Sequence, residues 1–278
     1  MAAPRIYLSA IGSDVAVCYC KVCDAPADLD GYADFSKSCV DPATTDEQAN
    51  PLPIPYMRCS QCGLLFTKAL DQWSSHQFLS HVYNEDYVSV DPDVVERRPT
   101  QNALLVRDLL QHFPTAKVMD YGTGSGRMPE LLRQWGVHAH GFEPIGQARE
   151  GHAKISHDMV TAFEVLEHTP TPRDTVAQML SFAKPQGVCL FSTYTSDNIL
   201  AHDVGHWYVA PRNGHVTIYT RRALAQLFSG YGWSVRHLSD GLHIAFHRLP
   251  SWLPAQPLIW HANPEIPLEP ISSSGEPA

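Results

Sequence analysis

The sequence Val118-Met119-Asp120-Tyr121-Gly122-Thr123-Gly124-Ser125-Gly126 joins a strand to a helix through three glycines. Residues 117–121 form the predicted strand and residues 128–135 the predicted helix. Glycines allow the backbone to approach a ligand closely, and a helix start offers unpaired N–H groups. The spacing is G-x-G-x-G, whereas dinucleotide sites use G-x-G-x-x-G. The carboxylate of Asp120 would repel a pyrophosphate and attract an ammonium group.

Strand and helix patterns alternate on both sides of this turn. A helical apolar face runs from Leu104 to Phe113. After the turn, we predict strands at 137–142 and 158–163, a helix at 171–183 that stops at 184–187, a strand at 188–193, a helix at 221–229, and strands at 235–238 and 242–247. This alternation predicts an α/β fold with a mostly parallel sheet covered on both faces, ending in one antiparallel hairpin. The predicted strand at 137–142 ends at Glu143, where a carboxylate can accept hydrogen bonds from both hydroxyls of a ribose.

Four segments together resemble the class I S-adenosylmethionine-dependent methyltransferases. They are residues 118–126, Gly141-Phe142-Glu143-Pro144, Ala162-Phe163-Glu164-Val165-Leu166-Glu167-His168 and residues 184–193. Their order and spacing are similar to the branch that includes the ubiquinone-biosynthesis O-methyltransferases. The resemblance implies a Rossmann-like, seven-stranded, mostly parallel sheet. It also implies a helix, a strand and an acidic adenine loop after Glu143, where this chain has only residues 144–157.

The resemblance also assigns cofactor contacts. The glycine turn would hold the methionine part of S-adenosyl-L-methionine, Glu143 the ribose, and Phe163 and Glu164 the sulfonium side. The complete set of expected cofactor residues is Asp120, Tyr121, Gly122, Thr123, Gly124, Gly126, Glu143, Pro144, Phe163 and Glu164.

Cysteine spacing predicts a metal site near the N-terminus. The chain has seven cysteines, six of them before residue 63. The odd number and the lack of an export-signal pattern argue against a disulfide framework. Cys20-Lys21-Val22-Cys23 and Cys59-Ser60-Gln61-Cys62 supply four thiolates, the ligand set of a tetrahedral structural Zn²⁺. Cys18 and Cys39 are rival ligands, and Cys189 lies in an apolar run typical of a core.

Composition and proline content set the organisation of the chain. The 278 residues are 44% hydrophobic with a net charge of −9, which favours a packed core and disfavours binding to nucleic acid or anionic membrane by bulk charge. We expect a zinc-binding module and connecting arm at 1–92, with Trp73, Phe78, Tyr83 and Tyr87 in the arm. A methyltransferase domain at 93–249 and a proline-rich tail at 250–278 follow. We expect the front of the tail, with Trp252, Leu258, Ile259 and Trp260, to pack on the body of the protein. No apolar run is long enough to span a bilayer, so we expect a cytoplasmic enzyme whose partner is a small molecule.

The acceptor side is predicted around residues 205–217, which follow the fifth strand. His215, His206 and His168 are candidate bases, because methyl transfer needs alignment and, for some acceptors, removal of a proton. Trp207, Tyr208 and Arg212 are candidate substrate contacts, with Arg212 suited to a carboxylate or phosphate. We expect a sugar or a secondary-metabolite intermediate as the acceptor, methylated on oxygen.

Three alternatives stay open at this point. Glu164, Glu167 and His168 with the distant His215 would allow Mg²⁺ or Mn²⁺ binding, as in the similar arrangement of small-RNA terminal 2′-O-methyltransferases, although Glu-His here is structural in other relatives. The short segment at 144–157 favours a degenerate methyltransferase fold that binds without turnover. A dinucleotide-dependent oxidoreductase is disfavoured by the glycine spacing.

Overall fold

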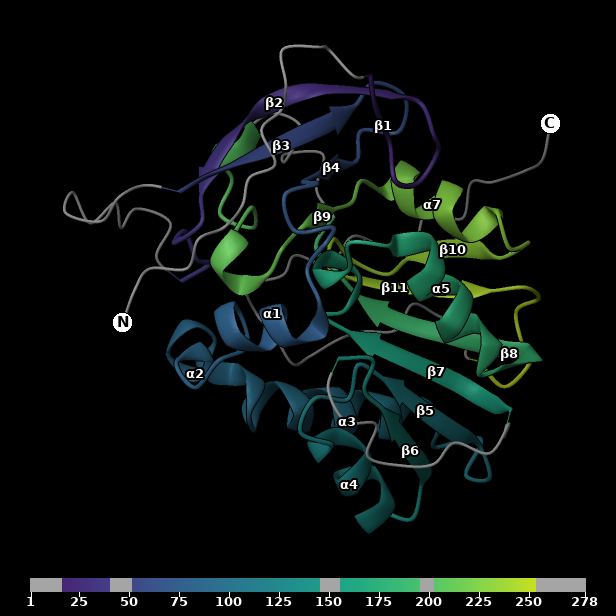
Figure 1. Cartoon of the computed structure of the whole chain (residues 1–278). Coiled ribbons are helices and arrows are strands. Elements are labelled where there is room, and N and C mark those ends of the chain that lie inside the picture. The colour runs from purple at the N-terminus through teal and green to yellow at the C-terminus, as the bar shows by residue number, and fades with distance from the viewer. Residues whose placement is uncertain (1–16, 41–51, 146–155, 196–202, 254–278) are drawn as a thin grey trace.

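A computed structural model describes residues 17–40, 52–145, 156–195 and 203–253. They form two β-sheets, with the smaller sheet A above one end of the larger sheet B (Figure 1). The strands of sheet B are β5 (Lys117–Tyr121), β6 (His138–Phe142), β7 (His157–Phe163), β8 (Ala183–Ser192), β10 (Ser234–His237) and β11 (Leu242–Phe246).

Sheet B has the strand order β10-β11-β8-β7-β5-β6. The neighbours among β6, β5, β7 and β8 are parallel, and β11 pairs antiparallel with both β8 and β10. The mixed α/β sheet and the terminal hairpin agree with the expectation from sequence. The described residues supply six strands, so the expected count of seven is not confirmed; residues 146–155, between β6 and β7, lie outside them.

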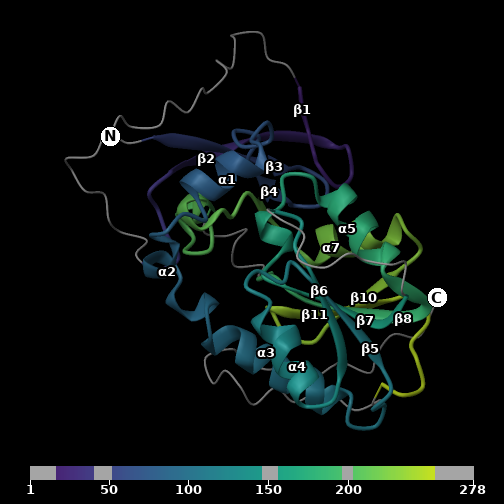
Figure 2. The ribbon, with the colours of Figure 1, turned by 60° about the horizontal axis from the view of Figure 1, so that its bottom comes forward.

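Helices cover both faces of sheet B, as Figure 2 shows. Helices α3 (Arg97–Leu109) and α4 (Arg127–Gln134) pack on one face, and α5 (Pro172–Ser181) and α7 (Arg221–Ser229) on the other. The alternation of side chains along β5 explains the two cores, because Val118 packs with α3 and α4 while Met119 packs with α5 and α7.

Two sequence predictions within this sheet need correction. Helix α3 begins at Arg97, and its buried residues include Ala103 and Val106, whereas Leu104 is 36% exposed. The predicted stop after α5, at residues 184–187, lies within β8, which begins at Ala183. Ala183 pairs with His157 of β7 and Val188 with Met159, and the register shifts between these two pairs. The Lys-Pro-Gln-Gly segment therefore forms a bulge between two paired parts of β8.

Sheet A combines segments from both halves of the chain. Its order is β1-β2-β3-β4-β9, and its strands are β1 (Cys18–Tyr19), β2 (Pro26–Asp34), β3 (Pro53–Cys59), β4 (Leu65–Phe66) and β9 (Thr217–Ile218). Strand β9 lies about 150 residues after β4 and pairs with it at Leu65↔Ile218. The cysteine-bearing segment therefore shares a sheet with the loop that follows β8.

The connecting arm contains α1 (Ser75–His81) and α2 (Tyr87–Val90). A capping box at Ser74 and Gln77 begins α1. Short 3₁₀ turns lie at Pro92–Val94, Leu166–His168, Asp203–Gly205 and Pro211–Asn213.

The described start of the tail packs on the body, as predicted. The Trp252 and Phe113 ring centroids are 5.4 Å apart, and Leu253 is buried. Leu258, Ile259 and Trp260 lie outside the described residues. Within the described part of the chain, no helix combines the length and apolar character needed to cross a bilayer. The division at residues 92 and 249 stays a prediction.

Candidate functional site

The carboxyl ends of β5, β6, β7 and β8 open on a cavity of about 1340 Å³. The chain passes from β5 to β6 on one side and then to β7 on the other. Such a reversal of strand order leaves a crevice beyond the strand ends, where α/β proteins bind ligands. The cavity therefore lies where the glycine turn was predicted to act.

The glycine turn is open, and Glu143 points back at it. The Gly124 N–H donates to Glu143 Oε2 at 2.7 Å, and the Ile145 N–H donates to Oε1 at 2.9 Å. Gly122 and Gly124 have positive φ angles of 75° and 53°. Among the described residues, a Cβ at Gly124 would meet no atom within 4 Å, so the backbone there offers free space for a ligand. The assignment of this turn and Glu143 to a cofactor stays a prediction.

Asp120 is buried below this turn, with 5% of its surface exposed. Its Oδ1 accepts a hydrogen bond from the Thr161 hydroxyl at 2.9 Å. Burial raises the pKa of Asp120 to about 7, because a carboxylate in an apolar environment loses hydration. A cationic ligand group at the cavity wall would favour the ionised form.

The end of β7 adopts a strained conformation. Glu164 has φ +54°, a left-handed value uncommon for a side-chain-bearing residue. Ser192 of β8 holds it on two sides: the Glu164 N–H donates to Ser192 Oγ at 2.8 Å, and the Ser192 hydroxyl donates to Glu164 Oε1 at 2.7 Å. Phe163 and Glu164 both line the cavity, as expected from sequence.

The other part of the cavity is lined by aromatic and imidazole side chains. Trp207, Tyr208, His168 and His215 contribute from the segments after β7 and β8. The arm and the cysteine-bearing segment close the same space with Cys39, Trp73, Phe78, Tyr83 and Tyr87. This part of the cavity is a composite of both halves of the chain.

Two predicted acceptor residues make other contacts. His206 is buried, its Nδ1 accepts the Tyr208 N–H at 3.2 Å, and it is not among the lining residues. The Arg212 guanidinium donates to the Val82 carbonyl at 2.8 Å and to Asn84 Oδ1 at 3.0 Å, and it also lies outside the lining. Both contacts hold the loop in place.

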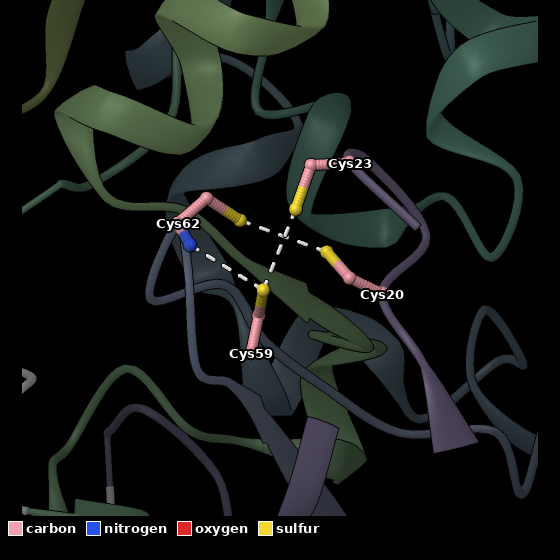
Figure 3. A group of neighbouring side chains, drawn as sticks. All are labelled: Cys20, Cys23, Cys59 and Cys62. Carbon is pink, nitrogen blue, oxygen red and sulfur yellow. Dashed lines mark hydrogen bonds between the residues drawn. The ribbon is translucent and has the colours of Figure 1, made fainter. Parts of the chain in front are cut away.

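The four predicted cysteines come together at the edge of sheet A (Figure 3). The Cys20 and Cys62 sulfurs are 3.6 Å apart, and those of Cys23 and Cys59 are 3.5 Å apart. These separations exclude disulfides and approach the edge of about 3.8 Å that a tetrahedron with 2.3 Å metal–sulfur bonds requires. The Cys62 N–H points at Cys59 Sγ at 3.3 Å, which favours thiolates.

The two rival cysteines lie outside this cluster. The Cys39 sulfur is instead 3.8 Å from His215 Nδ1. Cys18 sits on β1 and Cys189 is fully buried in sheet B.

Sequence analysis missed several residues of the cavity. Ser192 positions Glu164, and Gln178 accepts a hydrogen bond from the Tyr121 hydroxyl at 2.6 Å. Arg98 forms a bidentate pair with Asp91 at 2.7 and 2.9 Å. Gln178 and Arg98 belong to no recognisable motif, and the contact of Ser192, within residues 184–193, with Glu164 was not predicted, because the two residues are distant along the chain.

Comparisons with known proteins find similarity to methyltransferases. A family model described as "Methyltransferase domain" matches residues 94–238. The ubiquinone biosynthesis O-methyltransferase of Azoarcus sp. (strain BH72) is 34% identical over 101 residues, which is 28% of this chain and 43% of the relative. The protein with the same name from Burkholderia thailandensis is 27% identical over 137 residues, 39% of this chain and 59% of the relative. The chain thus spans about half the length of these curated relatives.

One solved structure illustrates the level of structural similarity. The 1,6-didemethyltoxoflavin-N1-methyltransferase of Burkholderia thailandensis, with its bound substrate and S-adenosylhomocysteine, has a TM-score of 0.43 and 17% identity. The aligned region covers 67% of this chain and 93% of the chain of that enzyme.

Proposed function

The chain belongs to the class I S-adenosylmethionine-dependent methyltransferases, and from that membership we propose that it methylates a small-molecule acceptor in the cavity at the ends of β5–β8. The observation that carries the proposal is the open glycine turn with the Glu143 carboxylate bound to the Gly124 N–H. S-adenosyl-L-methionine supplies an electrophilic methyl group when bound. The chain's residues must hold donor and acceptor in line and accept any released proton.

The proposed donor contacts follow the strand ends. Residues 120–124 of the turn face the amino-acid end of the donor, with the Asp120 carboxylate near its ammonium group. Glu143 and Pro144 take the ribose side, and Phe163 and Glu164 take the sulfonium side. All of these residues line the cavity, whereas Gly126 lies just beyond it and allows the turn through its φ of +80°.

The proposed acceptor contacts are Trp207, Tyr208, His168 and His215. The His215 Nδ1 donates to the Tyr208 carbonyl at 2.7 Å, so Nε2 carries the lone pair. Burial lowers the pKa of both His168 and His215, so both imidazoles are neutral near neutral pH. Aromatic walls suit a flat or ring-shaped acceptor, and we propose an oxygen nucleophile on a sugar or secondary-metabolite intermediate.

We also propose that the four-cysteine cluster binds a structural Zn²⁺. All-thiolate ligation leaves no open position for substrate, so the ion would hold the fold together. The cluster joins the turn between β1 and β2 to the turn between β3 and β4, and three of its cysteines pack in the hydrophobic core, which agrees with that role.

The experiment that tests the donor proposal is calorimetry with S-adenosyl-L-methionine on the folded protein. We expect binding by the wild type and none by Gly124→Arg, whose side chain would enter the open space at the turn. Radiolabelled methyl transfer to a panel of extract-derived acceptors then tests turnover. A folded protein that binds no S-adenosyl-L-methionine contradicts the proposal, and binding without transfer would support a degenerate fold.

A further inference from the structure

Three side chains at the acceptor end of the cavity converge. Glu167, His168 and His215 each present one ligand atom, and these atoms lie within 4.8 Å of one another. The first two follow β7, and the third precedes β9. The Val216 N–H donates to the Glu167 carbonyl at 2.8 Å, which fixes the two segments against each other. This backbone hydrogen bond therefore keeps the three side chains close to one another.

Hydrogen bonding leaves ligand atoms of this cluster unused. Glu167 is fully buried; its Oε1 accepts the Tyr208 hydroxyl at 2.7 Å, and its Oε2 has no hydrogen-bond partner among the residues that the structure describes. His168 Nδ1 is also buried and has no partner within the same described part of the chain. His215 donates through Nδ1 to the Tyr208 carbonyl, so its Nε2 lone pair is available. Buried polar atoms without partners are rare and point to a missing ligand.

The charge balance favours a cation. Glu167 is fully buried, and the acidic side chain of Glu164 lies near it. The Arg98 guanidinium, which lines the same cavity, is already paired with Asp91. A buried carboxylate next to two neutral imidazoles lacks a positive partner, and a metal ion would supply one.

We propose that Glu167, His168 and His215 bind one divalent transition-metal cation of the Mn²⁺, Fe²⁺, Co²⁺ and Zn²⁺ class. Two imidazoles with one carboxylate suit these ions better than Mg²⁺ or Ca²⁺, which prefer oxygen ligands. Metal–ligand bonds of about 2.0–2.2 Å need a modest contraction of the cluster.

The surroundings of the cluster resemble the outer shell of a metal site. Tyr208 orients two of the three ligands, through its hydroxyl on Glu167 and its carbonyl on His215. Such outer contacts fix the tautomer and direction of ligating groups. Glu164 is bound by Ser192 and lies outside the cluster, so the ligand set differs from the one the sequence pattern left open.

The site would deepen the proposed function, on which this step rests. His168 and His215 line the cavity, and three protein ligands leave coordination positions open. An acceptor hydroxyl at such a position would lose its proton to water more easily, because a bound cation lowers the pKa of an oxygen ligand. The acceptor class is then one with a hydroxyl or phenol oxygen.

The test is titration of zinc-replete protein with MnCl₂, with free Mn²⁺ measured by electron paramagnetic resonance. The protein is loaded with one zinc per chain, which occupies the four thiolates, and excess zinc is removed. Bound Mn²⁺ then reports the second site. We expect one Mn²⁺ per chain for the wild type, and at least tenfold weaker binding for Glu167→Gln and for His215→Gln. His157→Gln changes a buried histidine at the start of β7, the opposite end of that strand from the cluster; it is the matched control and should bind as the wild type does.

Tyr208→Phe provides a second route if a ligand variant fails to fold. It keeps the ring and the carbonyl but removes the hydroxyl from Glu167, and we expect a loss of about 10- to 100-fold in Mn²⁺ affinity. Absence of Mn²⁺ binding by the wild type, or equal binding by all variants, overturns the proposal. Calorimetry with S-adenosyl-L-methionine on the same samples separates this outcome from failure of the proposed function.

Discussion

Gly122 and Glu164, both at the cavity, have left-handed backbone conformations for different reasons. Gly122 has φ +75° because the chain must turn sharply between β5 and α4, and a Cβ there would lie 2.5 Å from Val165 Cγ2. Glu164 has φ +54° although it carries a side chain, at a cost of about 1–3 kcal/mol. Two hydrogen bonds with Ser192, one accepted and one donated by its hydroxyl, hold Glu164 in this conformation. Strain at this position places the Glu164 carboxylate at the cavity wall.

Replacement of Gly122 by alanine tests the close approach at the turn. Gly136 has a similar φ of +83° with nothing within 4 Å of a Cβ, so Gly136→Ala is the matched control. We expect about 1–2 kcal/mol of destabilisation in both from the left-handed conformation, with a further 1–3 kcal/mol in Gly122→Ala from the contact with Val165. Urea unfolding followed by circular dichroism measures both. Equal losses would contradict the argument.

Helix α7 links the cysteine cluster to sheet B. Its N-cap, Thr220, accepts the Ala223 N–H at 3.0 Å and donates to the Cys62 carbonyl at 2.6 Å. One hydroxyl therefore both begins the helix and holds the second cysteine knuckle. The apolar side of α7, with Leu224 and Phe228, packs on sheet B.

Thr220→Val should weaken both elements at once. We expect a loss of about 1–2 kcal/mol in unfolding free energy from the missing cap and faster transfer of zinc to a colorimetric chelator. Ser74→Ala removes the cap of α1, which lies away from the cluster, and is the matched control. It should lower stability by a similar amount and leave zinc release unchanged. Identical zinc release in the two variants would show that the Cys62 contact has no role.

The β10–β11 hairpin buries a histidine pair. His237 Nδ1 and His243 Nδ1 are 2.9 Å apart, and His243 Nε2 donates to the Thr193 carbonyl at 2.9 Å. Burial lowers the pKa of His237 to about 4 and that of His243 to about 3. Unfolded histidines bind protons below pH of about 6.5, so the unfolded state holds more protons than the folded state below that pH. Stability from this pair is present above pH 6.5 and is lost as the pH falls towards 4.

His237→Gln should flatten the acid side of the stability curve. With one such histidine removed, we expect the slope of unfolding free energy between pH 6 and 4.5 to fall by up to about 1.4 kcal/mol per pH unit. His138→Gln, which changes an exposed histidine on β6, should leave the slope unchanged. Chemical denaturation at a series of pH values gives the comparison, and parallel curves for the two variants would refute the expectation.

At the scale of the whole molecule, the cysteine-bearing segment contacts the later part of the chain at several separate places. Strand β9 pairs with β4 across sheet A. Arg173 of α5 donates to the Val22 carbonyl at 2.7 Å inside the first knuckle. Lys37 Nζ donates to the Val204 and His206 carbonyls at 2.8 Å. The proposed zinc thereby supports a wall of the acceptor cavity from outside it.

Loss of zinc should act on one part of the cavity. In Cys59→Ser we expect less than one zinc per chain, a lower melting temperature, and faster amide exchange in β3, β4 and β9. Strands β5 and β7 should keep their protection, because they hydrogen-bond to each other and to β6 and β8 inside sheet B. Cys18→Ser, a cysteine beside the cluster, should retain zinc. Uniform loss of protection across both sheets would contradict this division.

The sequence by itself determined the features that depend on neighbouring residues. The glycine turn, the two cysteine knuckles, the strand–helix alternation and the position of Glu143 were predicted from it. Left-handed backbone, ligand spacing within a knuckle and side-chain periodicity are set within a few residues, so they are visible in a linear pattern.

Tertiary structure decided what depends on packing between distant segments. It selected Cys20, Cys23, Cys59 and Cys62 over Cys18 and Cys39. It extended β8 through a segment that reads as a turn, and turned His206 and Arg212 towards backbone and side-chain partners outside the cavity lining. It also brought His215 to Glu167 and His168, 48 and 47 positions earlier in the sequence. No local pattern encodes such contacts, because each is fixed by how whole elements pack together.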